Sequence, residues 1–132
     1  LVIVNPALQP CFRHCMKQQG AILAKGWLLG VQFSAILKDN LYLELAARAN
    51  GLARELTGGL QALGVSLLST SPSNQVFPLL LDHVVERLAE DFTFEIQQPS
   101  QNGYTGIRLV TGWYSTREDV DTFLQRLEVL LK

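Results

Sequence analysis

The sequence predicts an α/β chain in which long helices are followed by a small α+β module with a mostly antiparallel sheet. Two observations point to this fold class. Up to residue 63, apolar residues recur at helical spacing or form long apolar runs, whereas later the apolar stretches are short and separated by turn residues. The later stretches indicate the order β-β-α-β-β-α, which is typical of a sheet covered by helices on one face. With 132 residues, 48% of them hydrophobic, the chain is long enough to bury a core.

Composition and charge narrow the classes of protein. The formal net charge is −1, which gives no reason to expect a nucleic acid or an acidic membrane as partner. The two cysteines, Cys11 and Cys15, imply no disulfide framework, and their helical spacing suits two reduced, packed thiols. A cytoplasmic setting is the simplest interpretation. The chain starts without Met or a signal-peptide pattern, and residues 1–4 are typical of a buried strand, so we expect a longer parent protein.

The first part of the chain is expected to continue from that strand into two helices. Asn5 and Pro6 end the strand, and a helix follows from about Pro6 to Gly20. Residues 21–37 are apolar almost all round, which is typical of a helix buried in a large enzyme or at a subunit interface. A membrane span usually needs about 20 apolar residues. This run is shorter and carries Lys25, which makes a membrane span the weaker interpretation.

A third helix is expected over residues 41–63. Asp39 or Asn40 is suited to cap its start, and Gly64 is suited to end it. Leucines recur along this segment at helical spacing and predict its core-facing stripe. They are Leu41, Leu45, Leu52, Leu56, Leu60 and Leu63.

The strands of the module that follows are recognised by their short apolar runs. They are predicted at residues 65–69, 75–81, 92–98 and 104–112. Pro78 places the second strand at a sheet edge, because proline cannot donate a hydrogen bond to a ladder. Turns are predicted at residues 70–74 and 99–103, where serine, asparagine, proline and glycine gather.

Two helices complete the module. The first is predicted over residues 82–91 with Asp82 as its cap. The last begins at Ser115 or Thr116, and Ser115 with Glu118 fits a capping box. Helical spacing predicts that its buried residues are Val120, Phe123, Leu124, Leu127 and Leu131.

Arg108 is the candidate functional residue that this pattern singles out. It lies between Ile107 and Leu109 in an apolar strand, and a buried charge needs a partner. A planar guanidinium on a rigid strand is suited to grip a carboxylate through two parallel hydrogen bonds. The alternative is an arginine at a sheet edge that pairs with a structural Asp or Glu. Spacing alone leaves these two interpretations about even.

Other reactive side chains give weaker signals. Cys11, His14 and Cys15 have poor spacing for zinc and lack a second ligand pair, so packed thiols are the favoured interpretation. His83 is interpreted as a surface histidine. A catalytic amine requires a buried lysine with a lowered pKa, and Lys25 on the apolar segment is a better candidate than the two remaining lysines of this region. Those two are Lys17 and Lys38.

Four stretches occur in a joint order and spacing that is fairly specific. They are MKQQGAILAKGWLLGVQF (16–33), LYLELAARANGLARELTGGLQALG (41–64), SPSNQVFPLL (71–80) and GIRLVTGWYSTREDVD (106–121). Together they resemble the pyridoxal-phosphate-dependent enzymes of the threonine aldolase and β-eliminating lyase group. The resemblance implies the aspartate-aminotransferase-like fold, with residues 1–38 as the end of the large cofactor-binding domain and 39–132 as the small C-terminal domain with its linking helix.

The resemblance also implies a chemistry and its residues. The family forms a Schiff base between pyridoxal 5′-phosphate and a lysine, here expected before Leu1, and uses the ring as electron sink. Arg108 matches the arginine that holds the substrate α-carboxylate. Lys25 and Gln32 fall in a region near the cofactor phosphate or the neighbouring subunit of a dimer or tetramer.

Two functions follow as hypotheses. The first is the C-terminal segment of a lyase acting on a β-hydroxy or β-substituted amino acid, inactive by itself. The run GWLLGVQF lacks the arginine that aldolase members typically carry here, so a related lyase with another substrate stays open. The second is a non-catalytic oligomerisation or interaction module, because these 132 residues contain no complete catalytic set.

Overall fold

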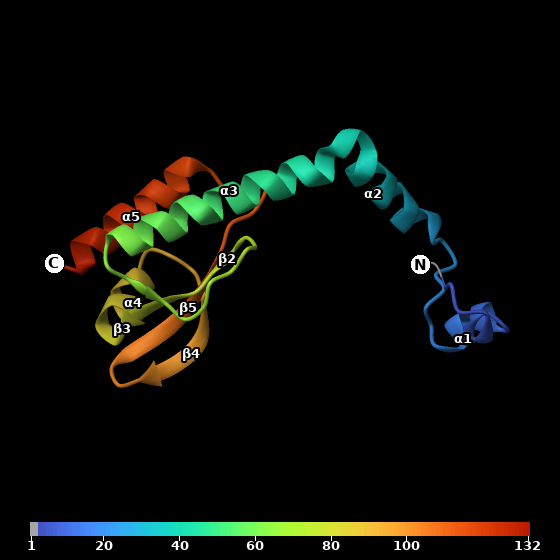
Figure 1. Ribbon diagram of the computed structural model, residues 1–132, viewed down its shortest axis with the longest axis horizontal. Helices are drawn as coiled ribbons and strands as arrows, with labels where there is room; N and C mark the ends of the chain where they lie inside the picture. Colours follow the sequence, from blue (N-terminus) through green and yellow to red (C-terminus); the bar gives the residue numbers. More distant parts are fainter. Residues whose placement is uncertain (1–2) are drawn as a thin grey trace. The chain divides into compact units, whose positions relative to one another are not determined.

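The computed structural model describes residues 3–132 and divides the chain into two units, Leu1–Asn40 and Leu41–Lys132. This division falls two residues after the predicted boundary at residue 38. The first unit is helical, and none of the residues in its four elements is buried. These elements are η1 (Pro6–Leu8), α1 (Phe12–Gln18), α2 (Trp27–Leu37) and η2 (Lys38–Asn40) (Figure 1). That this unit ends a large cofactor domain stays a prediction.

Several predictions for the first unit are wrong in detail. The strand at residues 1–4 lies partly outside the described residues, and Ile3 and Val4 are not in a strand. The helix predicted from Pro6 to Gly20 is interrupted because Cys11 has a left-handed φ of 58°, which separates η1 from α1. The apolar run forms a helix only from Trp27 onward.

The two cysteines are also not packed as predicted. Cys11 and Cys15 are free thiols and both are exposed. The physical reason is that α1 has only seven residues and buries none of them within its unit. No group of three or more potential metal ligands is present among residues 3–132. Within the same range, no helix combines the length and apolar character needed to cross a bilayer.

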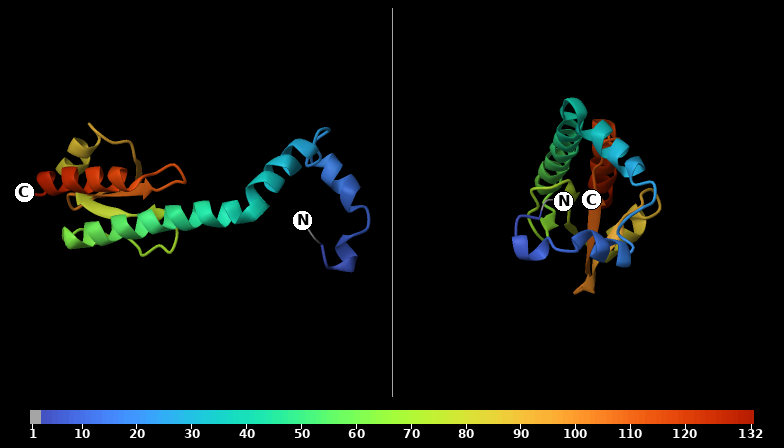
Figure 2. Two further views of the ribbon diagram at one scale, coloured as in Figure 1. Left: turned by 90° about the horizontal axis from the view of Figure 1, so that it is seen from above. Right: turned by 90° about the vertical axis from the view of Figure 1, so that its right-hand side faces the viewer.

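The second unit is a sheet with helices on one face, as predicted. The long helix α3 (Leu41–Ala62) contacts the C-terminal helix α5 (Arg117–Leu130), and Figures 1 and 2 show these two helices side by side. The short helix α4 (Asp82–Leu88) packs against α5 and the sheet. The strands are β1 (Ser66–Leu67), β2 (Gln75–Val76), β3 (Pro78–Leu81), β4 (Glu95–Gln101) and β5 (Tyr104–Val110).

The core of this unit is formed by the inner faces of α3, α4, α5 and the sheet. Its fully buried side chains include Leu60, Leu88, Ile107 and Leu127, each with an exposed fraction of 0%. Only the middle of the predicted α3 stripe is buried, at Leu52, Leu56 and Leu60, whereas Leu41 is exposed and Leu45 and Leu63 are half-buried. In α5 the predicted stripe is confirmed for Val120, Phe123 and Leu127, whereas Leu124 is half-buried and Leu131 is exposed.

All strand pairs are antiparallel, and β5 is the central strand. It pairs with β4 on one side and with β3 and β2 on the other, and β1 pairs with β3. Val76 faces Leu109 and Leu79 faces Gly106 in a single register, so β2 and β3 are one strand interrupted at Phe77–Pro78. The interruption follows from the missing N–H of Pro78. The edge position predicted from Pro78 is wrong, because β3 lies between β1 and β5.

The β4–β5 hairpin is tighter than predicted. Asn102 and Gly103 have φ values of 54° and 82°, so the turn is a two-residue loop in which both residues have positive φ. The proposed turn at 99–103 is therefore wrong, because β4 continues through Pro99 to Gln101. Proline is tolerated there because β4 pairs only with β5 among the described strands and has register shifts along its length.

The helix caps also differ from the sequence interpretation. Thr116, not Ser115, caps α5, and it forms a reciprocal capping box with Asp119 instead of Glu118. Asp82 is the first residue of α4 and makes no cap. Its carboxylate instead accepts hydrogen bonds from Ser100 and Thr105, 2.5 and 2.7 Å away, and so ties α4 to the β4–β5 hairpin.

Candidate functional site

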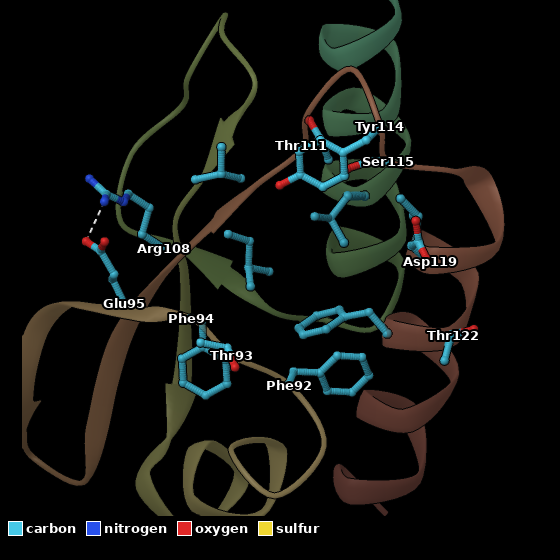
Figure 3. A pocket seen from close by; sticks show the side chains of 15 residues that line it. Phe92, Thr93, Phe94, Glu95, Arg108, Thr111, Tyr114, Ser115, Asp119 and Thr122 are labelled. Atoms are coloured by element: carbon cyan, nitrogen blue, oxygen red, sulfur yellow. Dashed lines mark hydrogen bonds and ion pairs between the residues drawn. The ribbon is translucent and has the colours of Figure 1, made fainter.

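Arg108 lies near the end of the central strand β5, on the face of the sheet opposite the helices. Its neighbour Ile107 is fully buried in the core, and Leu109 packs against the same core. Because side chains alternate along a strand, Arg108 is directed to the other face. Glu95 is its directly opposite residue on β4, and the two side chains form an ion pair from Arg108 Nη2 to Glu95 Oε2 (Figure 3).

This ion pair satisfies only part of the guanidinium. The side chain of Arg108 is 31% exposed and that of Glu95 is 72% exposed, so water screens the pair and we expect it to contribute only about 0.2–1 kcal/mol. The Nε atom of Arg108 is buried and has no hydrogen-bond partner. Leaving a buried donor unpaired costs about 1–3 kcal/mol, and such an atom calls for a ligand or another explanation.

The geometry bears on both interpretations of Arg108. The pairing with Glu95 is the arrangement expected of an arginine with a structural carboxylate. However, that carboxylate contacts Nη2 alone, whereas a carboxylate bound in parallel to a guanidinium uses two N–H groups. The unpartnered Nε shares one edge of the planar fork with Nη2, so half of this edge is without a protein acceptor.

A cavity of about 540 Å³ lies between β5, the segment before β4 and α5. This volume is within the range of small-molecule sites. Its apolar wall includes Phe92 and Phe123, whose rings meet edge to face with centroids 5.1 Å apart. Figure 3 shows Arg108 and Glu95 at one side of this cavity, away from Phe92 and Asp119. Its polar lining includes Thr111, Tyr114, Ser115, Asp119 and Thr122.

The end of β5 is fixed to α3 and to the loop before β2. The buried Thr111 donates from Oγ1 to the carbonyl of Ala49, 2.7 Å away, and its own carbonyl accepts from Asn74 Nδ2 at 2.6 Å. Arg48 Nη2 donates to the carbonyl of Ser115 at 3.1 Å. These bonds join residues 37 to 67 positions apart in the chain and hold the strand that carries Arg108.

Within the loop after β5, local bonds set the start of α5. Ser115 Oγ accepts from the backbone N–H of Gly112 at 2.9 Å. The hydrogen bond from the backbone N–H of Thr116, and then that from its hydroxyl, hold the pKa of Asp119 below its usual value. Asp119 is therefore charged and occupied as a capping group, so we assign it no catalytic role.

The remaining predicted site residues are not brought together with one another. Lys25 precedes α2 and Gln32 lies within it, and both are exposed. Lys25 is two residues before the start of α2, and a role for it and Gln32 toward a cofactor stays a prediction. Lys17 and Lys38 are exposed too, so neither has the buried setting that a catalytic amine requires. His83 is exposed, as predicted.

The described residues therefore do not fit a complete pyridoxal phosphate site. A Schiff-base site needs a lysine amine inside a pocket together with convergent groups for the phosphate. No lysine lines the 540 Å³ cavity, and its one arginine already contacts Glu95. Thr111, Asn74 and Arg48 were missed by sequence reasoning, because their partners are far away in the chain and no local pattern signals them.

No family model matches this chain, and neither does any curated protein. Among solved structures it is similar to threonine aldolase from Leishmania major, with 42% identity and a TM-score of 0.92. That match covers 98% of this chain and 38% of the aldolase chain, so the chain spans less than two fifths of that relative.

Two serine palmitoyltransferases are more distant neighbours. The enzyme from Sphingomonas wittichii and that from S. paucimobilis are each 22% identical, with TM-scores of 0.52 and 0.51, and each match covers 64% of this chain and 23% of the other. The second of these structures contains an aldimine of pyridoxal phosphate and myriocin. These two likenesses concern the fold alone. The match to the aldolase confirms the resemblance: the chain has the fold of the C-terminal region of a threonine aldolase.

Proposed function

We propose that this chain is the C-terminal segment of a pyridoxal-phosphate-dependent carbon–carbon lyase that acts on a β-hydroxy or β-substituted amino acid. The relation to threonine aldolase supports the class of enzyme. The observation that carries the role of Arg108 is its buried Nε without a partner, on the central strand of the sheet. A substrate α-carboxylate offers two parallel acceptors, one for Nη2 and one for the Nε that has no partner.

In this proposal Arg108 binds and orients the substrate. Two hydrogen bonds fix both the position and the plane of the carboxylate, whereas a point charge fixes only its position. The orientation of the carboxylate determines how the bonds at Cα are presented to the reacting groups, so Arg108 contributes to the rate as well as to affinity. The hydrogen bonds of Thr111 to Ala49 and Asn74 support this role, since they hold the end of the strand that aims the side chain.

The rest of the catalytic set is proposed to lie outside these 132 residues. The described residues do not fit a cofactor site, and no reaction step is assigned to them beyond binding. The segment alone is therefore expected to be inactive. We also propose a homo-oligomer, because α2 exposes large apolar side chains, including Trp27 and Phe33, of the kind that interfaces bury.

The test is replacement of Arg108 in the whole enzyme. Arg108→Ala is expected to raise the KM for the amino acid roughly 10- to 150-fold, the loss of about 1.5–3 kcal/mol for hydrogen bonds to a charged group. Arg87→Ala is the matched control, because Arg87 also pairs with a glutamate on the surface of the same unit. An unchanged KM in Arg108→Ala excludes the carboxylate role, whatever the class of enzyme.

The exposed apolar helix also favours the second candidate, a non-catalytic oligomerisation or interaction module. Sedimentation of the 132-residue chain separates the two. A well-behaved monomer that binds a protein partner supports the module, whereas aggregation that is lost when Trp27 and Phe33 are replaced by serine supports a segment of a larger enzyme.

A further inference from the structure

Glu95 and Arg108 are held opposite each other by the backbone of the β4–β5 hairpin. Their pairing is fixed by the register of two antiparallel strands, in which the next pair is Ile96 with Ile107. Directly opposite side chains in a sheet lie close enough to interact without a change of backbone. The strand register therefore keeps the Glu95 side chain within reach of the guanidinium, and its rotamer decides whether the two touch.

The contact between them is one-sided. Glu95 Oε2 meets Nη2, while Nε on the same edge of the fork stays buried and unpartnered. Since Glu95 is mostly exposed, its side chain can turn into water at little cost. A ligand carboxylate that binds Nη2 and Nε together replaces this single contact with two and satisfies the buried donor.

We propose that Glu95 is a resident competitor for the substrate-binding arginine: its carboxylate occupies Nη2 of Arg108 in the free enzyme and is displaced when the α-carboxylate binds. This inference rests on the proposed function of Arg108. Glu95 thereby selects for ligands that bind Arg108 through both N–H groups, because a carboxylate must make both hydrogen bonds to displace it. A ligand that reaches only one N–H of the fork gains little over Glu95.

The consequence is a measurable penalty on substrate affinity. An exposed ion pair is weak, so its exchange reduces affinity only modestly, about two- to fivefold. Removing the charge of Glu95 while keeping its size is expected to lower the KM by this factor. The same change is expected to leave the affinity for an amine analogue without a carboxylate as it was, since that ligand does not contest Arg108.

The experiment is a double-mutant cycle in the whole enzyme. Glu95→Gln is expected to lower the KM for the amino acid about two- to fivefold in the wild-type background and not at all when Arg108 is alanine. Glu90→Gln is the control, because Glu90 pairs with Arg87 elsewhere on the same unit. A thermal unfolding scan of each variant identifies changes that arise from loss of fold.

Each outcome either supports or rejects the competitor role of Glu95. A KM that is unchanged or raised in Glu95→Gln overturns the competitor role, and so does an equal fall in the Arg108→Ala background. If Arg108→Ala itself leaves the KM unchanged, the proposed function of Arg108 has failed and this inference fails with it. If Arg108→Ala raises the KM while Glu95→Gln has no effect, only the competitor role is rejected.

Discussion

The two units of this chain differ in where their hydrophobic side chains go. In Leu1–Asn40 the helix α2 is almost wholly apolar, yet none of its residues is buried. In Leu41–Lys132 the apolar residues make up a smaller share of each helix but lie on single faces, and α3, α4 and α5 bury them against the sheet. The formation of a core thus depends on apolar faces that pack against one another, and the total hydrophobicity of a helix does not predict whether it is buried.

This difference matters for the candidate site. Arg108 belongs to the unit that has its own core, and its strand is anchored by long-range hydrogen bonds to α3. Lys25 and Gln32 belong to the other unit, in which none of residues 3–40 is buried, so packing within these residues does not fix their side chains. The packing of the element that carries a side chain therefore decides how firmly that side chain is aimed.

The largest expected difference in stability between the two units comes from truncating a buried core side chain. Leu60→Ala removes a fully buried side chain from the second unit and is expected to lower the free energy of unfolding by about 2–5 kcal/mol. Leu29→Ala, at an exposed position of α2, is expected to change it by no more than about 0.5 kcal/mol. Urea unfolding of the 132-residue chain measures both, and equal losses would contradict the contrast between the units.

A smaller effect is expected from filling the space at Gly106, which lies on the same face of β5 as Arg108. A Cβ there would collide with the side chain of Leu68 and approach Gln98 Cβ to 3.0 Å. Gly106→Ala is expected to destabilise the second unit by about 1–3 kcal/mol. Gly58→Ala is the control, since a Cβ at Gly58 in α3 meets nothing and should stabilise the helix by up to about 1 kcal/mol. The same sign for both substitutions would refute this reasoning.

The next largest expected effect on stability comes from the N-terminal cap of α5. Thr116→Ala removes the acceptor for the backbone N–H of Asp119 and is expected to cost about 0.5–2 kcal/mol. Ser115→Ala leaves the capping box intact, although it removes the acceptor of the Gly112 N–H. Chemical denaturation should therefore rank Thr116→Ala as the more destabilising of the two if the box is centred on Thr116, and the opposite order would restore the sequence-based assignment.

The smallest expected effect is on how the stability depends on pH. Hydrogen bonds from Ser100 and then from Thr105 lower the pKa of Asp82 from its ordinary 3.8. Because the folded pKa is below the unfolded one, this carboxylate adds stability above the unfolded pKa, and that stability is lost as the pH falls through the folded pKa. Asp82→Asn is therefore expected to flatten the acid limb of the stability curve. An acid limb identical to that of the wild type would show that Asp82 contributes nothing to it.

Much of the fold could be predicted from the sequence because the second unit obeys local rules. The leucine spacing in α3 and the stripe of α5 indicated helices that the structure contains, and Gly64 ends α3 with a φ of 77°. The Asn102–Gly103 pair carried an equally local hairpin signal. The predicted turn at 99–103 contains this pair, but it begins too early, because β4 continues through Pro99 to Gln101.

The rest depended on contacts that no local pattern contains. Arg108 was identified from its apolar surroundings, but its pairing with Glu95 requires the register of β4 against β5. Asp82 is a good capping residue by type, yet Ser100 and Thr105 occupy its carboxylate. In the first unit, the apolar run indicated a buried helix, and burial there requires a surface that Leu1–Asn40 does not provide.

The central claim is that Arg108 uses its Nε to bind a substrate carboxylate, and one measurement tests it directly. The Nε–H resonance of Arg108, assigned in the whole enzyme by its loss in Arg108→Lys, can be followed during titration with the amino acid substrate. We expect this resonance to shift and to become protected from exchange with water, and the matched amine without a carboxylate should leave it in place. If neither ligand moves the resonance while the amino acid still binds, Arg108 is a structural partner of Glu95 and the account is wrong.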